Sequence, residues 1–365
     1  MAAKKRKGGL LRSGYTTGAC AAAAAQAAAI ALLKQETVSR VQIDLPDGNQ
    51  VSFEVSRCVF DRGRALCSVI KDAGDDPDVT HGAEIRATVS WKEEPGISIM
   101  GGEGVGMVTR PGLEVPVNTA AINPVPRQMI ERSVRQAVHH QMRDKGLEAI
   151  ISVPGGDKLA RRTLNPRLGI AGGISILGTT GVVIPYSINA YKVSISQALD
   201  VAAAVGCRQV VLTTGRRSEK FAQRELALAE ECFVQVGDFI GYSLEECARR
   251  RLANVVIWGM TGKISKLAAG HLYTNVSDSK VDIGFLTRVA AGCGVPDKTL
   301  VVQQEAVTAN HFRKMLPADY HEDFCHKLCL LAAGKCRQAV RGELEVECIL
   351  SSYDGTILGR AHARG

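Results

Sequence analysis

Charged and amide side chains surround an irregular stretch in the first half of the chain, residues 97–127. Glu103 and Arg110 supply one charge of each sign, and Asn118 and Asn123 add neutral donors and acceptors. Glycine and proline leave almost no helical or strand periodicity there. So long an irregular segment is uncommon in a compact domain unless it forms a binding surface. We therefore expect a loop that holds a ligand, with a purely structural loop as the alternative.

Three alternating glycines, Gly102, Gly104 and Gly106, lie in this stretch. Without a Cβ atom, the backbone there can approach a ligand closely or adopt positive φ. The spacing is similar to a dinucleotide-binding fingerprint, but that fingerprint requires a helix directly after the glycine turn. The first good helical pattern begins only near Pro126, so we reject a dinucleotide site.

Four aspartates and His81 lie together within residues 72–81. Their spacing does not match an EF-hand loop, and no bidentate glutamate follows at the right distance. Asx turns, in which carboxylates accept local backbone N–H groups, are one interpretation. Catalysis or substrate binding through residues such as Asp76 and His81 is the other, and we expect no metal ligand.

An alanine-rich pattern over residues 19–34 predicts a helix, and Thr16 or Thr17 can cap its N-terminus. A helix N-terminus flanked by glycine is also suited to anions. A plain cap on a packed helix and an anion site both remain open at this stage.

Glycines recur at two later points. Each group of glycines is followed by polar residues. The density of glycines indicates close backbone approach to a ligand or to another chain. The residues concerned are Gly155, Gly156, Lys158, Gly172, Gly173, Thr179 and Thr180.

The pattern of elements differs before and after about Pro185. Before it, the sequence predicts a hairpin over residues 41–45 and 50–55, strands over 65–71 and 84–91, and a helix over 126–145. After it, short strands alternate with helices, which predicts βαβ units with right-handed crossovers. The expected fold class is an α+β N-terminal domain followed by an α/β Rossmann-like domain with a mostly parallel sheet. Helices are also expected over residues 299–307 and 317–341.

This pattern predicts four regions in the chain. They are a disordered basic tail over residues 1–11, an α+β domain over 12–190, a Rossmann-like domain over 191–341, and a C-terminal hairpin over 342–365 that packs onto either domain.

Ligands of parallel sheets lie beyond the carboxyl ends of the strands. Two expected strands end in turns of small residues with cations close by, among them Arg216. We expect an adenosine-type cofactor there, and tight turns needed by any such fold are the alternative. The cofactor candidates are Thr213, Thr214, Gly215, Gly259, Thr261 and Gly262.

Composition narrows the class of protein. The formal charge of +8 suits an anionic small molecule, and the 5% aromatic content argues against a stacking platform for nucleic acid. Eleven cysteines, without zinc-site spacing, favour a reduced cytoplasmic compartment. Cys325, Cys329 and Cys336 have the spacing of one buried helix face. No apolar stretch reaches the length of a membrane span.

Several motifs, in order from residue 12 to beyond residue 290, resemble the CbiD family of cobalt-precorrin-5B carbon-1 methyltransferases. The family acts in anaerobic cobalamin biosynthesis. The motifs are RSGYTTGACAAAA from Arg12, DAGDDPDVTHG from Asp72, GGEGVG from Gly101, NTAAINPVPR from Asn118, the Gly155 and Gly172 loops, and TTGR from Thr213.

This resemblance implies methyl transfer from S-adenosylmethionine to C-1 of cobalt-precorrin-5B, giving cobalt-precorrin-6A, with cobalt present only as part of the substrate. The substrate would lie against the first domain and the cofactor at the Thr213 and Gly259 turns. Asp76, His81 and Glu103 are candidates to stabilise the donor or move a proton. The expected substrate contacts are Thr16, Thr17, Gly102, Gly104, Gly106, Arg110, Asn118, Asn123, Arg127, Gly155, Gly156, Lys158, Gly172, Gly173, Thr179, Thr180 and Arg216.

Two other functions remain open: a nucleotide-dependent phosphotransferase and a non-catalytic tetrapyrrole carrier. We expect no nucleic-acid or membrane partner. The resemblance leaves room for a homo-oligomer and for transient contacts with neighbouring pathway enzymes.

Overall fold

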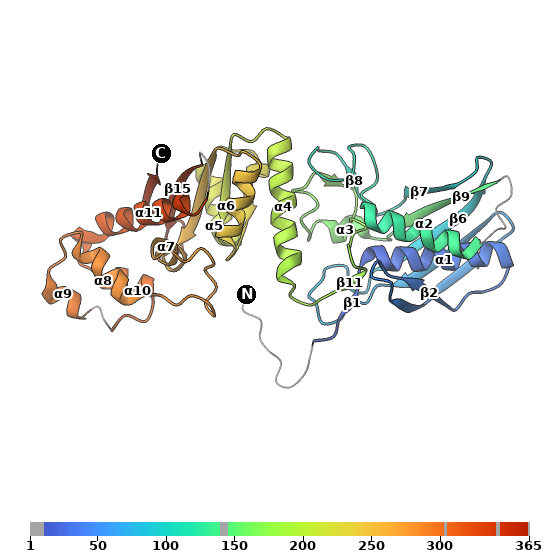
Figure 1. Ribbon diagram of the computed structural model, residues 1–365, viewed down its shortest axis with the longest axis horizontal. Coiled ribbons are helices and arrows are strands. Elements are labelled where there is room, and N and C mark those ends of the chain that lie inside the picture. Colours follow the sequence, from blue (N-terminus) through green and yellow to red (C-terminus); the bar gives the residue numbers. More distant parts are fainter. Residues whose placement is uncertain (1–10, 139–144, 303–304, 341–343, 364–365) are drawn as a thin grey trace. The chain divides into compact units, whose positions relative to one another are not determined.

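The computed structural model describes residues 11–138, 145–302, 305–340 and 344–363. The chain divides between Ser187 and Ile188 into two compact units, called unit 1 and unit 2 below (Figure 1). The predicted boundary at residues 190–191 falls inside the first turn of the helix that begins at Ile188. The predicted basic tail, except for Leu11, lies outside the described residues.

Unit 1 contains a five-stranded sheet with the order β4-β5-β6-β9-β7. Its neighbouring strands are antiparallel except for β7, which runs parallel to β9. The predicted hairpin is confirmed as the separate pair β2 and β3. The elements are β1 Gly14–Tyr15, α1 Thr17–Lys34, β2 Arg40–Asp44, β3 Gln50–Glu54, β4 Arg57–Phe60, β5 Arg64–Ile70, β6 Glu84–Lys92, β7 Ile97–Gly101, β8 Met107–Val108, α2 Pro124–Val138, β9 Gly146–Ser152, α3 Gly156–Ala160, β10 Ile170–Ala171 and β11 Val182–Val183.

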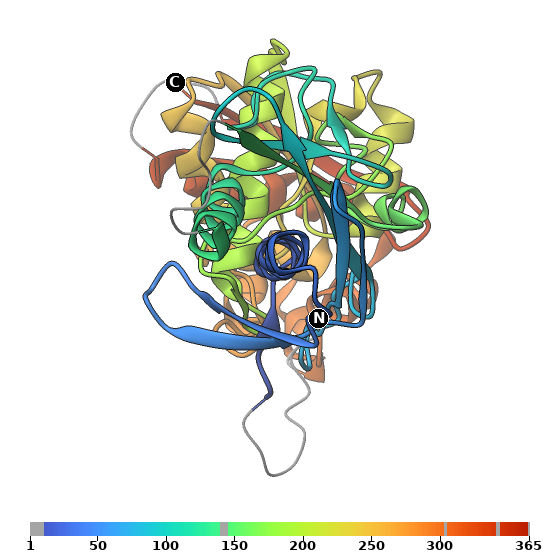
Figure 2. The ribbon, with the colours of Figure 1, turned by 90° about the vertical axis from the view of Figure 1, so that its right-hand side faces the viewer.

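Helix α1 forms the centre of unit 1. It packs against α2, against β5 and β6 of the large sheet and against β2 of the hairpin, and Figure 2 shows it nearly end-on between them. Alanine side chains around its whole circumference are fully buried, because their small size allows neighbours on every side to approach. By length and composition α1 could cross a membrane, but 83% of its apolar window is buried inside the structure.

Unit 2 contains a second five-stranded sheet, with the order β13-β12-β14-β15-β16. The first four strands pair in parallel, and β16 is antiparallel to β15. The C-terminal hairpin therefore continues the sheet of unit 2. The elements are α4 Ile188–Ala204, β12 Gln209–Thr213, α5 Arg216–Glu225, β13 Phe233–Gln235, α6 Ile240–Arg249, β14 Asn254–Met260, α7 Thr261–Ala268, α8 Ile283–Ala291, α9 Asp297–Val302, α10 Ala309–Met315, α11 His321–Gln338, β15 Glu345–Ser351 and β16 Ile357–Ala363.

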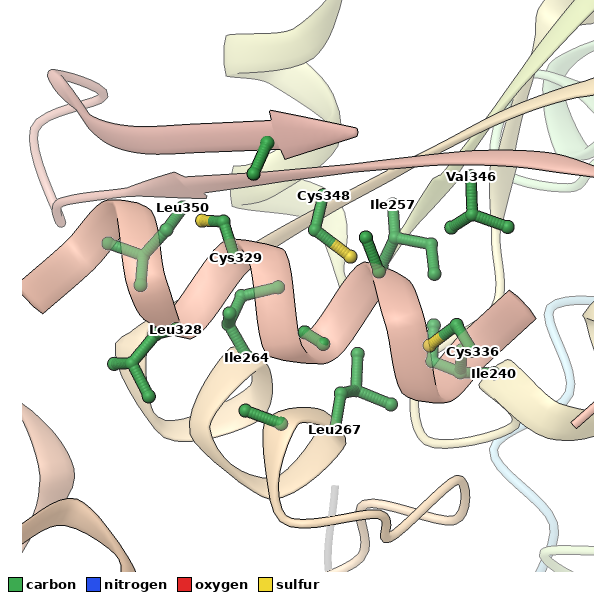
Figure 3. Packing of buried hydrophobic residues seen from close by; sticks show 14 of the residues in the cluster. Ile240, Ile257, Ile264, Leu267, Leu328, Cys329, Cys336, Val346, Cys348 and Leu350 are labelled. Atoms are coloured by element: carbon green, nitrogen blue, oxygen red, sulfur yellow. The ribbon is translucent and has the colours of Figure 1, made fainter. Parts of the chain in front are cut away.

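The main core of unit 2 lies where α11 meets the sheet (Figure 3). Cys325, Cys329 and Cys336 of α11 are almost completely buried, which confirms the predicted apolar helix face. Val346 and Cys348 of β15 pack against this face. A smaller core on the other side of the sheet joins residues of α5 to β12, β14 and β15.

Helix ends differ from the sequence predictions. The helix predicted over 317–341 begins at His321, because Ala318–Tyr320 forms a 3₁₀ turn after Pro317. The helix predicted over 299–307 is described over Asp297–Val302, and residues 303–304 lie outside the described residues. Helix α10 was not predicted; Thr308 caps it by accepting the N–H of His311.

Candidate active site

Segments far apart in the sequence meet at one end of unit 1. We call residues 101–110, 118–127, 153–158 and 169–181 the glycine-loop cluster. Backbone hydrogen bonds hold it together: Gly106 N–H donates to Ile174 O (2.8 Å), and Ile174 N–H donates back to Gly104 O (3.0 Å). Asn123 N–H donates to Ile176 O (3.0 Å), which brings the start of α2 into the same cluster.

Most of the predicted glycines serve contacts between these loops. A Cβ atom at Gly104, Gly156 or Gly173 would overlap backbone atoms of a neighbouring loop. At Gly102 it would overlap Ser152 of β9, and at Gly106 it would lie 2.8 Å from Gly173 O. The predicted close approach is therefore, at these positions, an approach of one loop of this chain to another. Gly155 and Gly172 differ, because a Cβ atom at either would face open space; both have positive φ, as Gly104 does.

Thr16 and Thr17 both use their hydroxyl groups within the protein. Thr16 Oγ1 caps α1 by accepting the N–H of Ala19 (3.2 Å). Thr17 Oγ1 accepts the N–H of Leu177 (2.9 Å) and donates to Ser175 O (3.1 Å). The N–H of Gly18 donates to Leu177 O (3.1 Å). Among the two interpretations left open by the sequence, this geometry favours a capped and packed helix N-terminus.

The acidic loop, residues 72–82, is built largely by its own carboxylates. The carboxylate of Asp72 accepts hydrogen bonds from both terminal nitrogens of Arg12, and its Oδ1 also accepts the N–H of Gly74 (2.9 Å). The ion pair with Arg12 lowers the pKa of Asp72 to about 2. Asp78 pairs with the buried Lys71 (2.6 Å) and accepts the N–H of Thr80 (2.7 Å). This is the Asx-turn chemistry that the sequence allowed.

Two of the three catalytic candidates lie in this loop. His81 is about half exposed, and its Nδ1 accepts the N–H of Ala73 (3.1 Å). The ring proton of a neutral His81 therefore lies on Nε2. Asp76 Oδ1 accepts the N–H of Tyr186 (2.9 Å), which joins the loop to the segment after β11.

Glu103, the third candidate, is exposed within the glycine-loop cluster. The hydrogen bond to Glu84 is the main cause that raises the pKa of Arg86 in β6, and the negative charge of Glu103 raises it further. Among the described residues, no hydrogen bond or ion pair joins Glu103 to Asp76 or His81. The structure therefore gives these three residues separate surroundings within one unit.

The predicted substrate contacts have varied environments. Arg127 donates to Ile99 O (3.0 Å), and the alkyl chain of Arg110 covers Gly169. Asn118 has positive φ and is exposed. The remaining candidates of this group, Lys158, Thr179, Thr180 and Arg216, are exposed, the last of them in unit 2.

The predicted cofactor turns of unit 2 lie at the carboxyl ends of adjacent strands. Thr213 of β12 is paired with Trp258 of β14, and Thr214 N–H donates to Trp258 O (3.2 Å). Thr213 is fully buried, and its hydroxyl donates to Val234 O (3.3 Å), so its role in the fold is structural. Gly259 packs near Ile264, and Thr261 is buried.

Two glycines at this edge remain open. Gly215 precedes α5 and Gly262 lies in the first turn of α7; a Cβ atom at either would have no neighbour within 4 Å. Neither helix has a side chain that caps its N-terminus through a hydrogen bond. Open helix N-termini at the carboxyl edge of parallel strands are suited to a polar or anionic ligand.

Sequence patterns do not single out Asp238 and Thr274, although both lie at the same edge. Asp238 follows Gly237, three residues after the end of β13, and that glycine–aspartate pair was the available signal. It accepts Thr274 Oγ1 (2.9 Å) and pairs with Lys263 of α7. Within the described ranges, no group of three or more His, Cys, Asp or Glu residues is placed to hold a metal ion.

The glycine-loop cluster of unit 1, the open turns at the sheet edge of unit 2 and the two five-stranded sheets define a mixed α/β protein with features of an enzyme for small molecules. Comparison with known families matches residues 3–185 to CbiD and residues 273–362 to the CbiD C-terminal domain. The chain belongs to the CbiD family.

Known relatives agree along nearly the whole length. A cobalt-precorrin-5B C(1)-methyltransferase of Geobacillus thermodenitrificans (strain NG80-2) is 48% identical over 356 residues, which cover 96% of this chain and 95% of the relative. The protein of the same name from Geobacillus kaustophilus (strain HTA426) is 47% identical, covering 96% and 95%. A crystal structure of a cobalamin biosynthesis protein (cbiD) from Archaeoglobus fulgidus is 32% identical, covers 73% of this chain and 83% of its own, and has a TM-score of 0.40.

Proposed function

We propose that this chain is a cobalt-precorrin-5B C(1)-methyltransferase: it moves a methyl group from S-adenosylmethionine to C-1 of cobalt-precorrin-5B and yields cobalt-precorrin-6A. The observation that carries the proposal is the 48% identity to a relative of that name over 96% of the chain. The relatives' names favour methyl transfer over a phosphotransferase or a tetrapyrrole carrier.

Unit 1 holds the tetrapyrrole in this proposal. A tetrapyrrole presents an apolar ring face and several carboxylates. Around the glycine-loop cluster, Met107, Leu164 and Leu177 each expose more than 40% of their surface. Lys158, Arg161 and Arg162 are exposed on the adjoining segment. Apolar contacts can therefore cover the ring while these cations pair with its carboxylates.

Unit 2 holds the methyl donor in this proposal. In its strand order β13-β12-β14, the chain passes from β12 to the neighbour on one side and then to the neighbour on the opposite side. In Rossmann-like sheets, ligands bind at such a switch point. Gly215 and Gly262 leave space at the same edge, so these residues fit a nucleoside-type donor. S-adenosylmethionine supplies a methyl group that is already electrophilic because it is bonded to a sulfonium.

The chain's own residues then have two tasks. The first is to align the nucleophilic carbon, the methyl group and the sulfur in one line, which converts binding energy into rate. The second is to move a proton as the macrocycle rearranges. We assign this to His81, because the N–H of Ala73 holds the ring at Nδ1, no described hydrogen bond uses Nε2, and the side chain is about half exposed. Asp76 and Glu103, which also belong to unit 1, are the other candidates to move this proton.

Titration calorimetry with S-adenosylhomocysteine, with magnesium–ATP as control, tests donor binding. We expect micromolar binding of the former and none of the latter. Incubation with cobalt-precorrin-5B and S-adenosylmethionine tests the reaction, and NMR of the product locates the new methyl group. A protein that binds ATP instead, or that forms no product methylated at C-1, contradicts the proposal.

We place the protein in the cytoplasm, because its eleven cysteines are all free thiols and a reducing compartment preserves them. A homo-oligomer and contacts with neighbouring pathway enzymes remain predictions, which sedimentation of the purified protein and of its mixtures would test.

A further inference from the structure

Two lysines of α7 belong to a set of interacting polar side chains that has no role in the function proposed above. We call Asp238, Lys263, Lys266 and Thr274 the lysine cluster. Lys266 is only 5% exposed, and its ammonium donates to Thr274 O (2.9 Å). The Lys263 ammonium donates to Asp238 Oδ1 and, at 3.3 Å, to the same Thr274 O. Thr274 Oγ1 completes the group by donating to Asp238 (2.9 Å).

The charges in this cluster do not balance. Two ammonium groups share one carboxylate and one carbonyl oxygen in the described contacts. Burial, with repulsion from Lys266, lowers the pKa of Lys263 to about 8. A buried charge is costly unless it is paired. One more anionic group would therefore be stabilised here.

The cluster faces the edge at which the donor is proposed to bind. Lys263 lies in the first turn of α7, directly after β14, and beside Gly262, whose Cα faces open space. Asp238 follows β13, on the other side of the central strand β12. Lys263 and Asp238 retain 28% and 21% side-chain exposure, so both can be reached from solvent. A ligand above β12 would meet one cation and one anion.

The methionine end of S-adenosylmethionine carries the matching pair, an α-carboxylate and an α-ammonium. We propose that Lys263 binds this carboxylate and Asp238 binds this ammonium, while Lys266 supplies fixed positive charge beneath them. The inference rests on the proposed function and adds to it the site for the amino-acid end of the donor. No covalent step is involved.

Two probes separate this contact from the rest of the donor site. S-adenosylhomocysteine has the amino-acid end, whereas 5′-methylthioadenosine has the same nucleoside and lacks both charges. Titration calorimetry of each probe is measured on the wild type, on Lys263→Met and on Lys266→Met. Lys327→Met, at an exposed position of α11, is the matched control. Circular dichroism and thermal unfolding verify that each variant is folded.

We expect Lys263→Met to weaken S-adenosylhomocysteine binding by about tenfold or more, since hydrogen bonds to charged groups contribute about 1.5–3 kcal/mol. Binding of 5′-methylthioadenosine should stay within about twofold of the wild type, because the lost contact is absent from that probe. Lys327→Met should change neither. The double variant Asp238→Asn with Lys263→Met, which leaves no unpaired carboxylate, should show the same selective loss if the single variant fails to fold.

An equal loss of affinity for both probes in Lys263→Met would mean that Lys263 supports the folded structure alone. That result would overturn the inference. Unchanged binding of S-adenosylhomocysteine would also overturn it. Both results leave the proposed function standing. A wild type that binds S-adenosylhomocysteine neither alone nor with the tetrapyrrole would overturn the inference and the proposed donor together.

Discussion

Gly173 and Gly104 pack so closely that a Cβ atom at Gly173 would overlap the carbonyl group of Gly104. The two residues come from different loops of the glycine-loop cluster, and Ile174 N–H donates to Gly104 O beside them. Gly173 does not have positive φ. Its lack of a side chain is therefore needed for space and not for backbone conformation, which makes it suitable for a direct test.

Gly173→Ala should destabilise the protein by about 1–3 kcal/mol, because the new methyl group meets backbone atoms that cannot move aside. Thermal and urea unfolding measure the change. Gly63→Ala is the matched control, since Gly63 is exposed and a Cβ atom there would lie 3.4 Å from its nearest neighbour, Asp61 Oδ1; it should stay within about 0.5 kcal/mol. Equal effects at both sites would contradict the packing argument.

Thr17→Val should cost about 1–3 kcal/mol of unfolding free energy, because Leu177 N–H and Ser175 O both lose a partner. Thr17→Ser keeps the hydroxyl and should recover most of that loss. Urea unfolding of the two variants gives the comparison. If the valine variant were as stable as the wild type, the hydroxyl contacts of Thr17 would contribute nothing to holding the start of α1.

Gly262→Ala should separate folding from donor binding. Gly262 lies in a helix and faces open space, so alanine should stabilise α7 by about 0.5–1 kcal/mol. The same methyl group occupies the proposed donor site, and affinity for S-adenosylhomocysteine should fall by about tenfold, or about 1.4 kcal/mol.

Gly334→Ala is the control for that experiment, because Gly334 is also helical and also faces open space, but lies in α11. It should raise stability without changing affinity. Calorimetric titration and thermal unfolding of both variants decide the matter, and undiminished affinity in Gly262→Ala would place the donor elsewhere.

Arg12→Ala should raise the pKa of Asp72 from about 2 toward the ordinary 3.8, because the guanidinium that stabilises the carboxylate is gone. In the wild type the native pKa lies below the unfolded one, so this contribution to stability is present above pH 3.8 and is lost as the pH falls toward 2. The difference in Tm between wild type and variant should therefore shrink over that range. Carboxyl ¹³C NMR follows the titration directly.

Arg40→Ala, which breaks an exposed ion pair with Glu54, should leave the Asp72 titration unchanged. A pKa of Asp72 that stays near 2 without Arg12 would show that the N–H of Gly74 is the dominant cause.

His81→Gln should lower kcat by about 10²–10⁴-fold if His81 moves a proton in the reaction. Glutamine can still accept a hydrogen bond but cannot exchange a proton near neutral pH. Turnover with cobalt-precorrin-5B is the measurement, and the unfolding curve verifies that the acidic loop is intact. Asp76→Asn and Glu103→Gln are measured alongside, and a variant with wild-type turnover removes its residue from the catalytic set.

Local sequence predicted many elements of the fold well. The alanine pattern from Ala19, the turn between β2 and β3, and the cysteine spacing of α11 each depend on neighbours within a few residues. Helix ends were less accurate: the sequence predicts a helix from Pro317, whereas a 3₁₀ turn over Ala318–Tyr320 delays the start of α11 to His321. Such details depend on which backbone groups find partners at the terminus.

The sequence by itself determined the family, the alternation of strands and helices in unit 2, and which loops are rich in glycine, because these are properties of residue order. Only the tertiary structure decided what those glycines do. It showed that Gly104, Gly156 and Gly173 make room for one another, whereas Gly155, Gly172, Gly215 and Gly262 face open space. It also brought Asp238 to Lys263 and Thr274. Contacts between distant segments depend on how elements pack in space, and no local pattern encodes them.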